Sequence, residues 1–525
     1  MFPHRQRSRW PPDMNLASNV ELPYDDAPPA ASAMLESLRG IGYSPAAAIA
    51  DLIDNSIAAG ASRVRVDFEW RGSGSIIRIT DNGRGMKREE LIQAMRPAGR
   101  HPLAPREPGD LGRFSLGLKT ASLSQGSLLA VASKVAGGDI ETRIWDLAYV
   151  EKVDSWNLLR EMPQEIVDDA DVLVTRPRGT VVIVARLDRL LGGKLNDNHV
   201  DRDRFLKLAR SVEAHLAMTF HRYLEGKDPP LVITVNGEDD AQKIEPWDPF
   251  VSHHKSTTPT PIEPLEHSGG SVEVQGFVLP HRDRMTSTEF ARAEGPSGWQ
   301  AHEGFFVYRG RRLLVSGGWL GLGPGRGWAQ TGVHRLARIR LDLATSGDLD
   351  WKVDIRKSIA LPPPALRARL QALAETVRRD AREIFAHRAG VSKRGPKKPI
   401  IRAWMPIPSS QGVTYRIDRS HAVIRHALDS IGHKRHIIEE MLAIIEATVP
   451  VQRIWIDVSE TADYTAPRAP TKLSVEEAAA LASLYRHMRA DLNLAANDAR
   501  ERLMVLEPFS SYPEAVRRLP DELDE

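Results

Sequence analysis

Residues 112–120 read GRFSLGLKT, a stretch one residue away from a phosphate-binding P-loop. A P-loop has the pattern G-x-x-x-x-G-K-[ST] and follows a β-strand. Here Leu118 separates the second glycine from Lys119, and the preceding residues EPGDLG carry no strand-like pattern. The stretch therefore favours the glycine-rich hinge of a lid. In such a lid, backbone N–H groups and a helix N-terminus face phosphates, and Lys119 supplies a point charge.

The residues on both sides of this hinge predict one α+β domain. Residues 86–111 are rich in Pro, Gly and Arg without periodicity, as is typical of a functional lid. Upstream, two helices are predicted, the second beginning at Pro45 after Ser44. Hydrophobic alternation predicts strands, and a helix is expected after Gly112. The predicted strands are 62–70, 75–81, 127–134, 141–147 and 179–187.

Farther along the chain the pattern predicts a second α+β unit and a mainly helical end. A helix over 201–224 is followed by a strand that runs into Asn236-Gly237, a strong hairpin signal. Strands are then expected at 271–279, 304–315 and 337–343, with a long helix over 361–385. Beyond a basic linker we expect helices at 421–430 and 436–447, a strand at 453–458, and a helix from Ser474 with a capping box to Glu477.

These patterns divide the 525 residues into five parts, because one hydrophobic core cannot serve so long a chain. The predicted parts are a flexible arm at 1–30, a first domain at 31–235, a second at 236–390, a linker at 391–402 and a C-terminal region at 403–525.

Composition limits the classes of function. Lys plus Arg (71) nearly balances Asp plus Glu (69), so any nucleic-acid surface must be local. The absence of cysteine excludes disulfides, thiolate zinc sites and cysteine nucleophiles. The basic N-terminus lacks the apolar core of a signal peptide, and no run approaches the roughly 18 apolar residues that span a bilayer. We expect a cytoplasmic protein with no membrane partner.

Two polar clusters flank the lid in the first domain. In DLIDNS, Asp51 and Asn55 lie four residues apart and share one face of the predicted helix. A carboxylate there can orient or deprotonate a water, and an amide oxygen can bind Mg²⁺. In DNGRGM, Asp81 ends a strand, and Gly83 and Gly85 let the backbone pass close to a flat ligand. Taken alone, each cluster also fits ordinary surface residues or a turn.

Together the clusters resemble a known superfamily. ADLIDNSIAAGA, ITDNGRGM, DLGRFSLGLKTASLSQ and RPRGTVVIV are similar, in order and spacing, to the four motifs of the GHKL ATPases. That superfamily contains gyrase B, the large heat-shock chaperones, histidine kinases, MutL and MORC, and the chain is most similar to bacterial MORC-like and MutL-like members. The resemblance implies a Bergerat-type ATPase sandwich, with helices on a mixed sheet. A transducer-like α+β domain and a mainly helical C-terminal region follow it.

The resemblance also implies roles for residues in the first domain. Asp51 falls on the general-base position, Asn55 on the Mg²⁺ ligand and Asp81 on the contact to the adenine amino group. The remaining ATP-binding positions are Gly83, Gly85, Met86, Gly112, Arg113, Phe114, Ser115, Leu116, Gly117, Leu118 and Thr180, with Lys119 on the terminal phosphate.

This chain departs from the pattern at three positions. Many relatives carry Glu in place of Asp51, and the shorter side chain withdraws the carboxylate by about 1.5 Å, so slow hydrolysis is expected. Ala58 stands near an aspartate of gyrase-like and MutL-like relatives, and Ser115 stands in place of a lid glycine.

The second domain is similar to a transducer. GFFVYRGRRLL and DWKVDIRKS resemble the MORC-like version, whose lysine reaches the terminal phosphate. The candidate is Lys357, with Lys352 behind it. A solvated lysine is the alternative.

The resulting hypothesis is a Mg²⁺-dependent ATPase whose closed lid drives two subunits together as a clamp on DNA. It would act in DNA repair, restriction or phage defence, with a helicase or nuclease as partner. Two alternatives stay open: an ATP-binding structural subunit with little hydrolysis, and a protein kinase of the histidine-kinase type. No dimerising helix with a phospho-accepting histidine precedes the motifs, which disfavours the kinase.

Three other features of the sequence are weaker indications of function. His253-His254 and the histidines at 421, 426, 433 and 436 lack metal-ligand spacing. The glycines of GWLGLGPGRGW predict a loop near the lid or a partner subunit, since Arg326 replaces the third glycine of G-x-G-x-x-G. The basic linker could meet DNA phosphates, although charge runs are usually solvated.

Overall fold

The computed structural model describes residues 25–99, 117–226, 230–267, 270–343, 350–352, 354, 360–386, 401–409, 412–450 and 473–521. Within them a six-stranded mixed sheet forms the first domain, in the order β4-β3-β5-β2-β1-β6. The strands are β1 (Arg63–Glu69), β2 (Ile76–Asp81), β3 (Leu128–Lys134), β4 (Ile140–Asp146), β5 (Gly179–Ala185) and β6 (Val232–Val235). Neighbours are antiparallel except β1 and β6, which are parallel.

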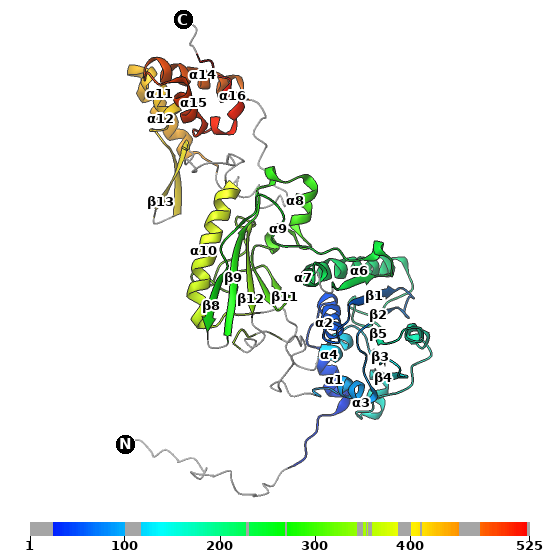
Figure 1. The fold of residues 1–525 in the computed structure, drawn as a ribbon. Coiled ribbons are helices and arrows are strands. Elements are labelled where there is room, and N and C mark those ends of the chain that lie inside the picture. Colours follow the sequence, from blue (N-terminus) through cyan, green and yellow to red (C-terminus); the bar gives the residue numbers. More distant parts are fainter. Residues whose placement is uncertain are drawn as a thin grey trace, which may run out of the picture.

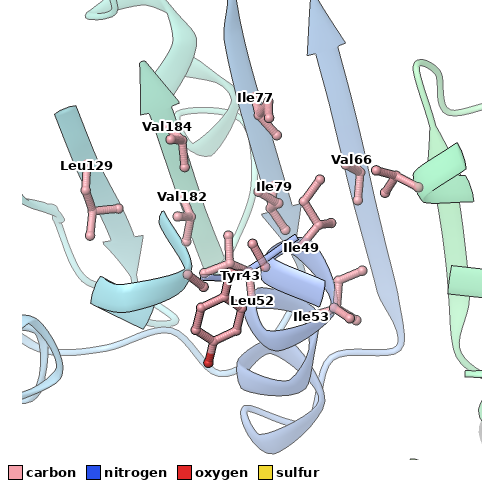
Figure 2. Packing of buried hydrophobic residues seen from close by; sticks show 14 of the residues in the cluster. Tyr43, Ile49, Leu52, Ile53, Val66, Ile77, Ile79, Leu129, Val182 and Val184 are labelled. Carbon is pink, nitrogen blue, oxygen red and sulfur yellow. The ribbon is translucent and has the colours of Figure 1, made fainter. Parts of the chain in front are cut away.

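Helices pack on one face of this sheet (Figure 1). They are α1 (Ala31–Arg39), α2 (Pro45–Ala58), α3 (Arg88–Met95), α4 (Gly117–Leu123), α5 (Leu147–Val153), α6 (His199–Thr219) and α7 (His221–Leu224). Figure 2 shows Ile49, Leu52 and Ile53 of α2 packed towards Ile79 and Val182 on the strands. The alternate strand residues form a separate core with the 3-10 turn at Asp168–Leu173 on the opposite face. The period of two in the strands therefore separates two cores.

A second mixed sheet has the order β11-β10-β12-β9-β7, and β8 also pairs with β9. Its strands are β7 (Thr258–Pro259), β8 (Glu263–His267), β9 (Gly270–Val278), β10 (Gly304–Arg309), β11 (Arg312–Ser316) and β12 (Ala337–Leu343). The long helix α10 (Pro364–Ala386) packs against β8, β9 and β12, while α8 (Ser287–Glu294) and α9 (Gly298–Ala301) precede β10. The two sheets are connected by the packing of α6 and α7 of the first domain, which lie beside β11 of the second sheet in Figure 1.

The C-terminal region contains a two-stranded hairpin, β13 (Trp404–Ser409) and β14 (Gly412–Ile417). Five α-helices follow it among the described residues: α11 (Ala422–Ser430), α12 (Arg435–Ala447), α14 (Val475–Ala490), α15 (Ala496–Met504) and α16 (Pro513–Arg517). The last three share one core with α11. The expected capping box is present, since Ser474 Oγ accepts from Glu477 N and the Glu477 carboxylate accepts from Ser474 N.

The α+β class predicted from the sequence is confirmed: helices cover a mixed sheet, and a further sheet and a helical region follow. Two local predictions are wrong. Residues 88–95 form helix α3 instead of an irregular loop, because Glu90 accepts from Lys87 N and caps the first turn. The Asn236-Gly237 turn does not form a strand hairpin, because β6 pairs in parallel with β1. The returning chain makes only an isolated bridge between Thr234 and Lys243.

Several predicted segments lie outside the described residues. They include most of the arm at 1–30, residues 100–111 of the lid, residues 112–116 of its hinge, most of the linker at 391–402 and the strand at 453–458. The domain limits at 31–235, 236–390 and 403–525 stay predictions.

Candidate functional site

Helix α2 carries the first cluster of candidate residues. It begins where the sequence predicts, with Pro45 in the first turn and Ser44 Oγ accepting from Ala47 N. Asp51 and Asp54 are both buried, whereas Asn55 is exposed. The amide nitrogen of Asn55 donates to the main-chain carbonyl of Asp51 over 3.1 Å, which leaves its amide oxygen to act as a ligand.

The carboxylate of Asp51 lies where several elements meet. Its Oδ2 accepts a 2.7 Å hydrogen bond from the hydroxyl of Tyr43, which precedes α2. A Cβ placed on Gly117, the first residue of α4, would lie 3.4 Å from the same oxygen. The Oδ1 atom lies 3.7 Å from a guanidinium nitrogen of Arg312, on β11 of the second sheet. The hydroxyl of Tyr43 has a raised pKa because it is buried next to the Asp51 carboxylate.

The second cluster forms a row across three neighbouring strands. Asp81 on β2 pairs in register with Thr180 on β5, and Thr180 pairs with Ser133 on β3. The hydroxyls of Ser133 and Thr180 lie 2.9 Å apart, and Ser133 Oγ accepts from Met86 N over 2.9 Å. Sheet register therefore brings together residues that lie about a hundred positions apart in the sequence.

Asp81 is buried, and both of its carboxylate oxygens accept hydrogen bonds. Its Oδ1 accepts from Gly83 N over 2.8 Å, and its Oδ2 accepts from Ser56 Oγ of α2 over 2.9 Å. Burial raises the pKa of Asp81, and these two hydrogen bonds oppose that shift. The bond from Ser56 connects this row directly to the helix that carries Asp51 and Asn55.

The glycines after Asp81 are required by close packing of the backbone. Gly85 has φ 72°, and a Cβ there would lie 2.0 Å from the carbonyl oxygen of Lys134. At Gly179 a Cβ would lie 2.2 Å from the carbonyl oxygen of Asp81. At Gly83 it would lie 2.9 Å from the Cβ of Ala59. These contacts hold the loop against β3, β5 and α2, so the packing of the protein's own backbone requires glycine at these positions.

Lys119 does not extend into solvent in this structure. It is buried on α4, and its Nζ donates over 2.9 Å to the carbonyl oxygen of Ala94 in α3. Burial lowers the pKa of Lys119 to about 8. A contact with a terminal phosphate would require Lys119 either to leave this carbonyl or to use another of its three N–H donors.

Part of the predicted site is not described. Gly112, Arg113, Phe114, Ser115 and Leu116 of the lid, and Lys357 of the second domain, lie outside the described residues. The next lid residues, Gly117 and Leu118, open α4, and Leu118 packs against the core of the first domain. Near the second-domain motif, Lys352 is exposed with φ 47°. Asp354 acts electrostatically on Tyr43, so this residue lies near the first domain.

The structure adds site residues that the sequence patterns did not single out. Asp54 and Arg312 form a buried ion pair, in which Arg312 Nε lies 3.2 and 3.1 Å from the two carboxylate oxygens. Tyr43 and Ser133 connect the predicted positions to one another. Asp54 could have been noticed in DLIDNS, three residues after Asp51. Arg312 lies in the transducer-like stretch GFFVYRGRRLL, but nothing in that stretch indicates that this arginine contacts Asp54.

Histidines and the glycine-rich loop, the weaker candidates from the sequence, make contacts within the protein. The ring of His254 bonds to the carbonyl of Arg284, and the rings of His426 and His487 are stacked 4.4 Å apart. Among the described residues, no group of three or more His, Asp or Glu side chains could hold a metal ion. The glycine loop at 317–328 packs on α10, where Arg367 donates to the carbonyl of Gly321.

Across the described part of the chain, no helix combines the length and the apolar character needed to cross a membrane.

Comparison with known proteins identifies the class of the first domain. Residues 43–180 match the model of the family described as "Histidine kinase-, DNA gyrase B-, and HSP90-like ATPase". This stretch contains Asp51, Asn55, Asp81 and Thr180, together with β2, β3 and the start of β5. The chain therefore contains a GHKL-type ATPase domain, a domain type that binds ATP.

The chain is also similar to DNA mismatch repair proteins. Over 182 residues the chain is 33% identical to the DNA mismatch repair protein MutL of Salmonella heidelberg (strain SL476). The same values hold for MutL of Salmonella agona (strain SL483) and of Salmonella schwarzengrund (strain CVM19633). The match covers 32% of this chain and 26% of each MutL, so the chain spans about a quarter of the length of these relatives.

Proposed function

We propose that the first domain binds Mg²⁺–ATP and hydrolyses it slowly, and that bound nucleotide drives two copies of the chain into a clamp that acts on DNA. The observation that carries this proposal is the hydrogen bond from Ser56 to Asp81. It connects a buried carboxylate at the end of strand β2 to the helix that carries Asp51 and Asn55. An acceptor suited to an adenine amino group thus lies beside groups suited to phosphate chemistry.

At the adenine end, the proposed contacts come from the sheet and its loop. Asp81 accepts a hydrogen bond from the adenine amino group while it keeps the donors Gly83 N and Ser56 Oγ, since a carboxylate oxygen can accept more than one hydrogen bond. Thr180 and Met86 complete this end. Gly85 keeps the loop close enough to β3 for Met86 N to donate to Ser133 Oγ.

At the phosphate end, the proposed contacts come from α2 and the lid. Asn55 fits a hard cation, because its amide nitrogen is already used as a donor within the helix. A bound Mg²⁺ would neutralise phosphate charge. Asp51 orients the attacking water and accepts its proton. The hinge of the lid, at 112–119, and Lys357 are proposed to enclose the phosphates.

The biological role is proposed from the relatives. The MutL proteins are named for DNA mismatch repair, which supports a role in DNA repair. The resemblance of GFFVYRGRRLL and DWKVDIRKS to MORC-like proteins supports the wider proposal of restriction or phage defence with a helicase or nuclease partner.

One observation favours a second candidate, an ATP-binding subunit with little hydrolysis. The carboxylate of Asp51 already accepts from Tyr43 and faces Arg312, and Lys119 is bonded to a main-chain carbonyl. These contacts hold both side chains against the protein, so a water and a phosphate could use only the hydrogen-bonding capacity that is left over. If Asp51→Ala leaves both turnover and biological output unchanged while Asp81→Ala abolishes the output, this candidate is correct.

The proposal is tested by measuring the mass of the protein in solution with and without a non-hydrolysable ATP analogue, and again with duplex DNA. We expect the mass to double with the analogue and the dimer to retain DNA at raised salt. An unchanged mass together with no binding of the analogue would contradict the proposal.

A further inference from the structure

Arg312 belongs to the second sheet but contacts α2 of the ATPase domain. It is the first residue of β11 and is buried. Its Nε lies 3.2 and 3.1 Å from the two oxygens of Asp54, and a terminal nitrogen lies 3.7 Å from Asp51 Oδ1. Another terminal nitrogen donates to the carbonyl of Leu313 over 2.5 Å, which fixes the guanidinium to its own strand.

This arrangement has an electrostatic reason. Asp51 and Asp54 lie three residues apart on one helix and are 3% and 1% exposed. Two buried carboxylates so close together repel each other and are costly to desolvate, so a buried cation beside them stabilises both. The planar guanidinium can face two carboxylates at once, which a lysine ammonium does less well. Burial, reinforced by the charge of Arg312, lowers the pKa of His215 to about 4, so this neighbouring ring is neutral near pH 7.

We propose that Arg312 is a positioning residue for ATP hydrolysis, through which the second domain holds α2 and thereby sets the place of the Asp51 carboxylate. This inference rests on the proposed ATPase function. Asp54 is the anchor of the contact, because it takes the shorter and doubled interaction. Asp51 lies at its edge, 3.7 Å away, and keeps its hydrogen bond from Tyr43. A shift of β11 relative to α2 would change the surroundings of Asp51 directly, whereas Asp81, Thr180 and Ser133 stay aligned by strand register.

A second contact between the domains provides a matched control. Arg222 on α7 lies 2.5 Å from a carboxylate oxygen of Asp342 on β12, and its guanidinium stacks 3.6 Å from the ring centre of Tyr308. This pair joins the first domain to the same sheet, but α7 carries none of the candidate site residues. Loss of Arg222 therefore weakens the domain contact in general, whereas loss of Arg312 also releases α2.

The experiment compares Arg312→Gln, Arg312→Lys and Arg222→Gln in the full chain. It measures the Kd of a fluorescent ATP analogue, kcat and KM for Mg²⁺–ATP, and hydrogen exchange of the α2 amides. For Arg312→Gln we expect kcat to fall about 10- to 100-fold, because small displacements of a catalytic group are costly. Its Kd should stay within about threefold of the unaltered value, because strand register and the bond from Gly83 N still hold Asp81 in place. The α2 amides should exchange faster. Arg312→Lys should recover part of kcat, and Arg222→Gln should leave kcat and α2 exchange unchanged.

The outcomes separate this inference from the proposed function. If the unaltered protein neither binds nor hydrolyses ATP, the proposed function fails and this inference fails with it. If it turns over ATP and Arg312→Gln does so equally well, only the inference is overturned. Equal losses of kcat in Arg312→Gln and Arg222→Gln also overturn it, since they indicate a general interface effect. If the unaltered protein binds ATP without measurable turnover, unchanged α2 exchange in Arg312→Gln overturns the inference, and faster exchange supports it.

Discussion

The two ends of the candidate nucleotide site are built in different ways. The adenine end lies within one sheet, where strand register alone aligns Asp81, Thr180 and Ser133. The phosphate end is assembled around Asp51 from α2, α4, the residue before α2, and a strand of the second domain. The first end is a fixed part of the ATPase fold. The second depends on the relative placement of several elements, which makes it the natural place for control.

The largest expected effect separates chemistry from binding. Asp51→Ala removes the proposed base at the phosphate end, and removal of a general base typically costs about 100- to 10,000-fold in rate. We expect ATP turnover to fall at least about 100-fold while nucleotide affinity changes little. Steady-state hydrolysis and equilibrium binding measure the two quantities separately. A parallel loss of affinity would mean that the two ends are not independent.

The adenine end should show the opposite behaviour. Asp81→Ala removes the acceptor for the adenine amino group, and a hydrogen bond to a charged group contributes about 1.5–3 kcal/mol. We expect the affinity for ATP to fall roughly 10- to 100-fold. Titration with a fluorescent ATP analogue measures this loss. The control is Asp67→Asn, which alters another buried aspartate, bonded to Arg65 and Arg78 on the same sheet. If both variants lose affinity equally, sheet stability and not recognition is responsible.

The rigidity of the adenine end can be tested at a glycine. Gly85→Ala forces a Cβ to within 2.0 Å of the Lys134 carbonyl oxygen at φ 72°, so we expect a loss of at least about 3 kcal/mol in the free energy of unfolding. Gly60 has the same φ, but nothing lies within 4 Å of its Cβ position. Gly60→Ala should therefore cost only about 1–2 kcal/mol. Denaturant unfolding compares the two, and equal losses would refute the packing argument.

The smallest expected effect concerns pH at the phosphate end. Burial lowers the pKa of Lys119 from 10.5 to about 8, so between these values the unfolded chain binds the proton that the folded chain has lost. The cost of burying the charge is thus fully present below pH 8 and is relieved as the pH rises towards 10.5. The stability of the native protein relative to Lys119→Met should increase over that window. Unfolding at several pH values measures it, with Lys87→Met, an exposed site, as control. A constant difference would show that Lys119 is not buried as a charge.

More of the adenine end than of the phosphate end could be predicted from the sequence, and the reason is physical. The alternation in SIIRITD and the apolar run in GTVVIVARL predict strands, and the residues at the ends of these strands then lie side by side. The position of Asp51 on α2 follows from Ser44 and Pro45, which start the helix. In contrast, Lys119 was expected on a phosphate and is bonded to Ala94. No local pattern reports that α3 forms in the lid segment and places this carbonyl nearby.

Contacts between residues far apart in the chain could not be predicted from the sequence either. Asp54 and Arg312 are 258 residues apart, and their contact depends on how β11 packs against α2 and α6. The same holds for the Asn236-Gly237 turn, where the parallel pairing of β6 with β1 prevailed over a local hairpin signal. Local propensity identifies elements, whereas the choice of partner strand is a property of the whole sheet.

The aromatic cluster that includes Met218 of α6 has a practical consequence for anyone who shortens the chain. Met218 shares this cluster with Trp247, Phe250, Phe277, Phe306, Tyr308 and Leu313, all of which follow β6 in the sequence. A fragment that stops at the end of β6 would lose every other member of the cluster and present Met218 to water, inviting aggregation. Biochemical work on the ATPase domain should therefore keep the second sheet attached.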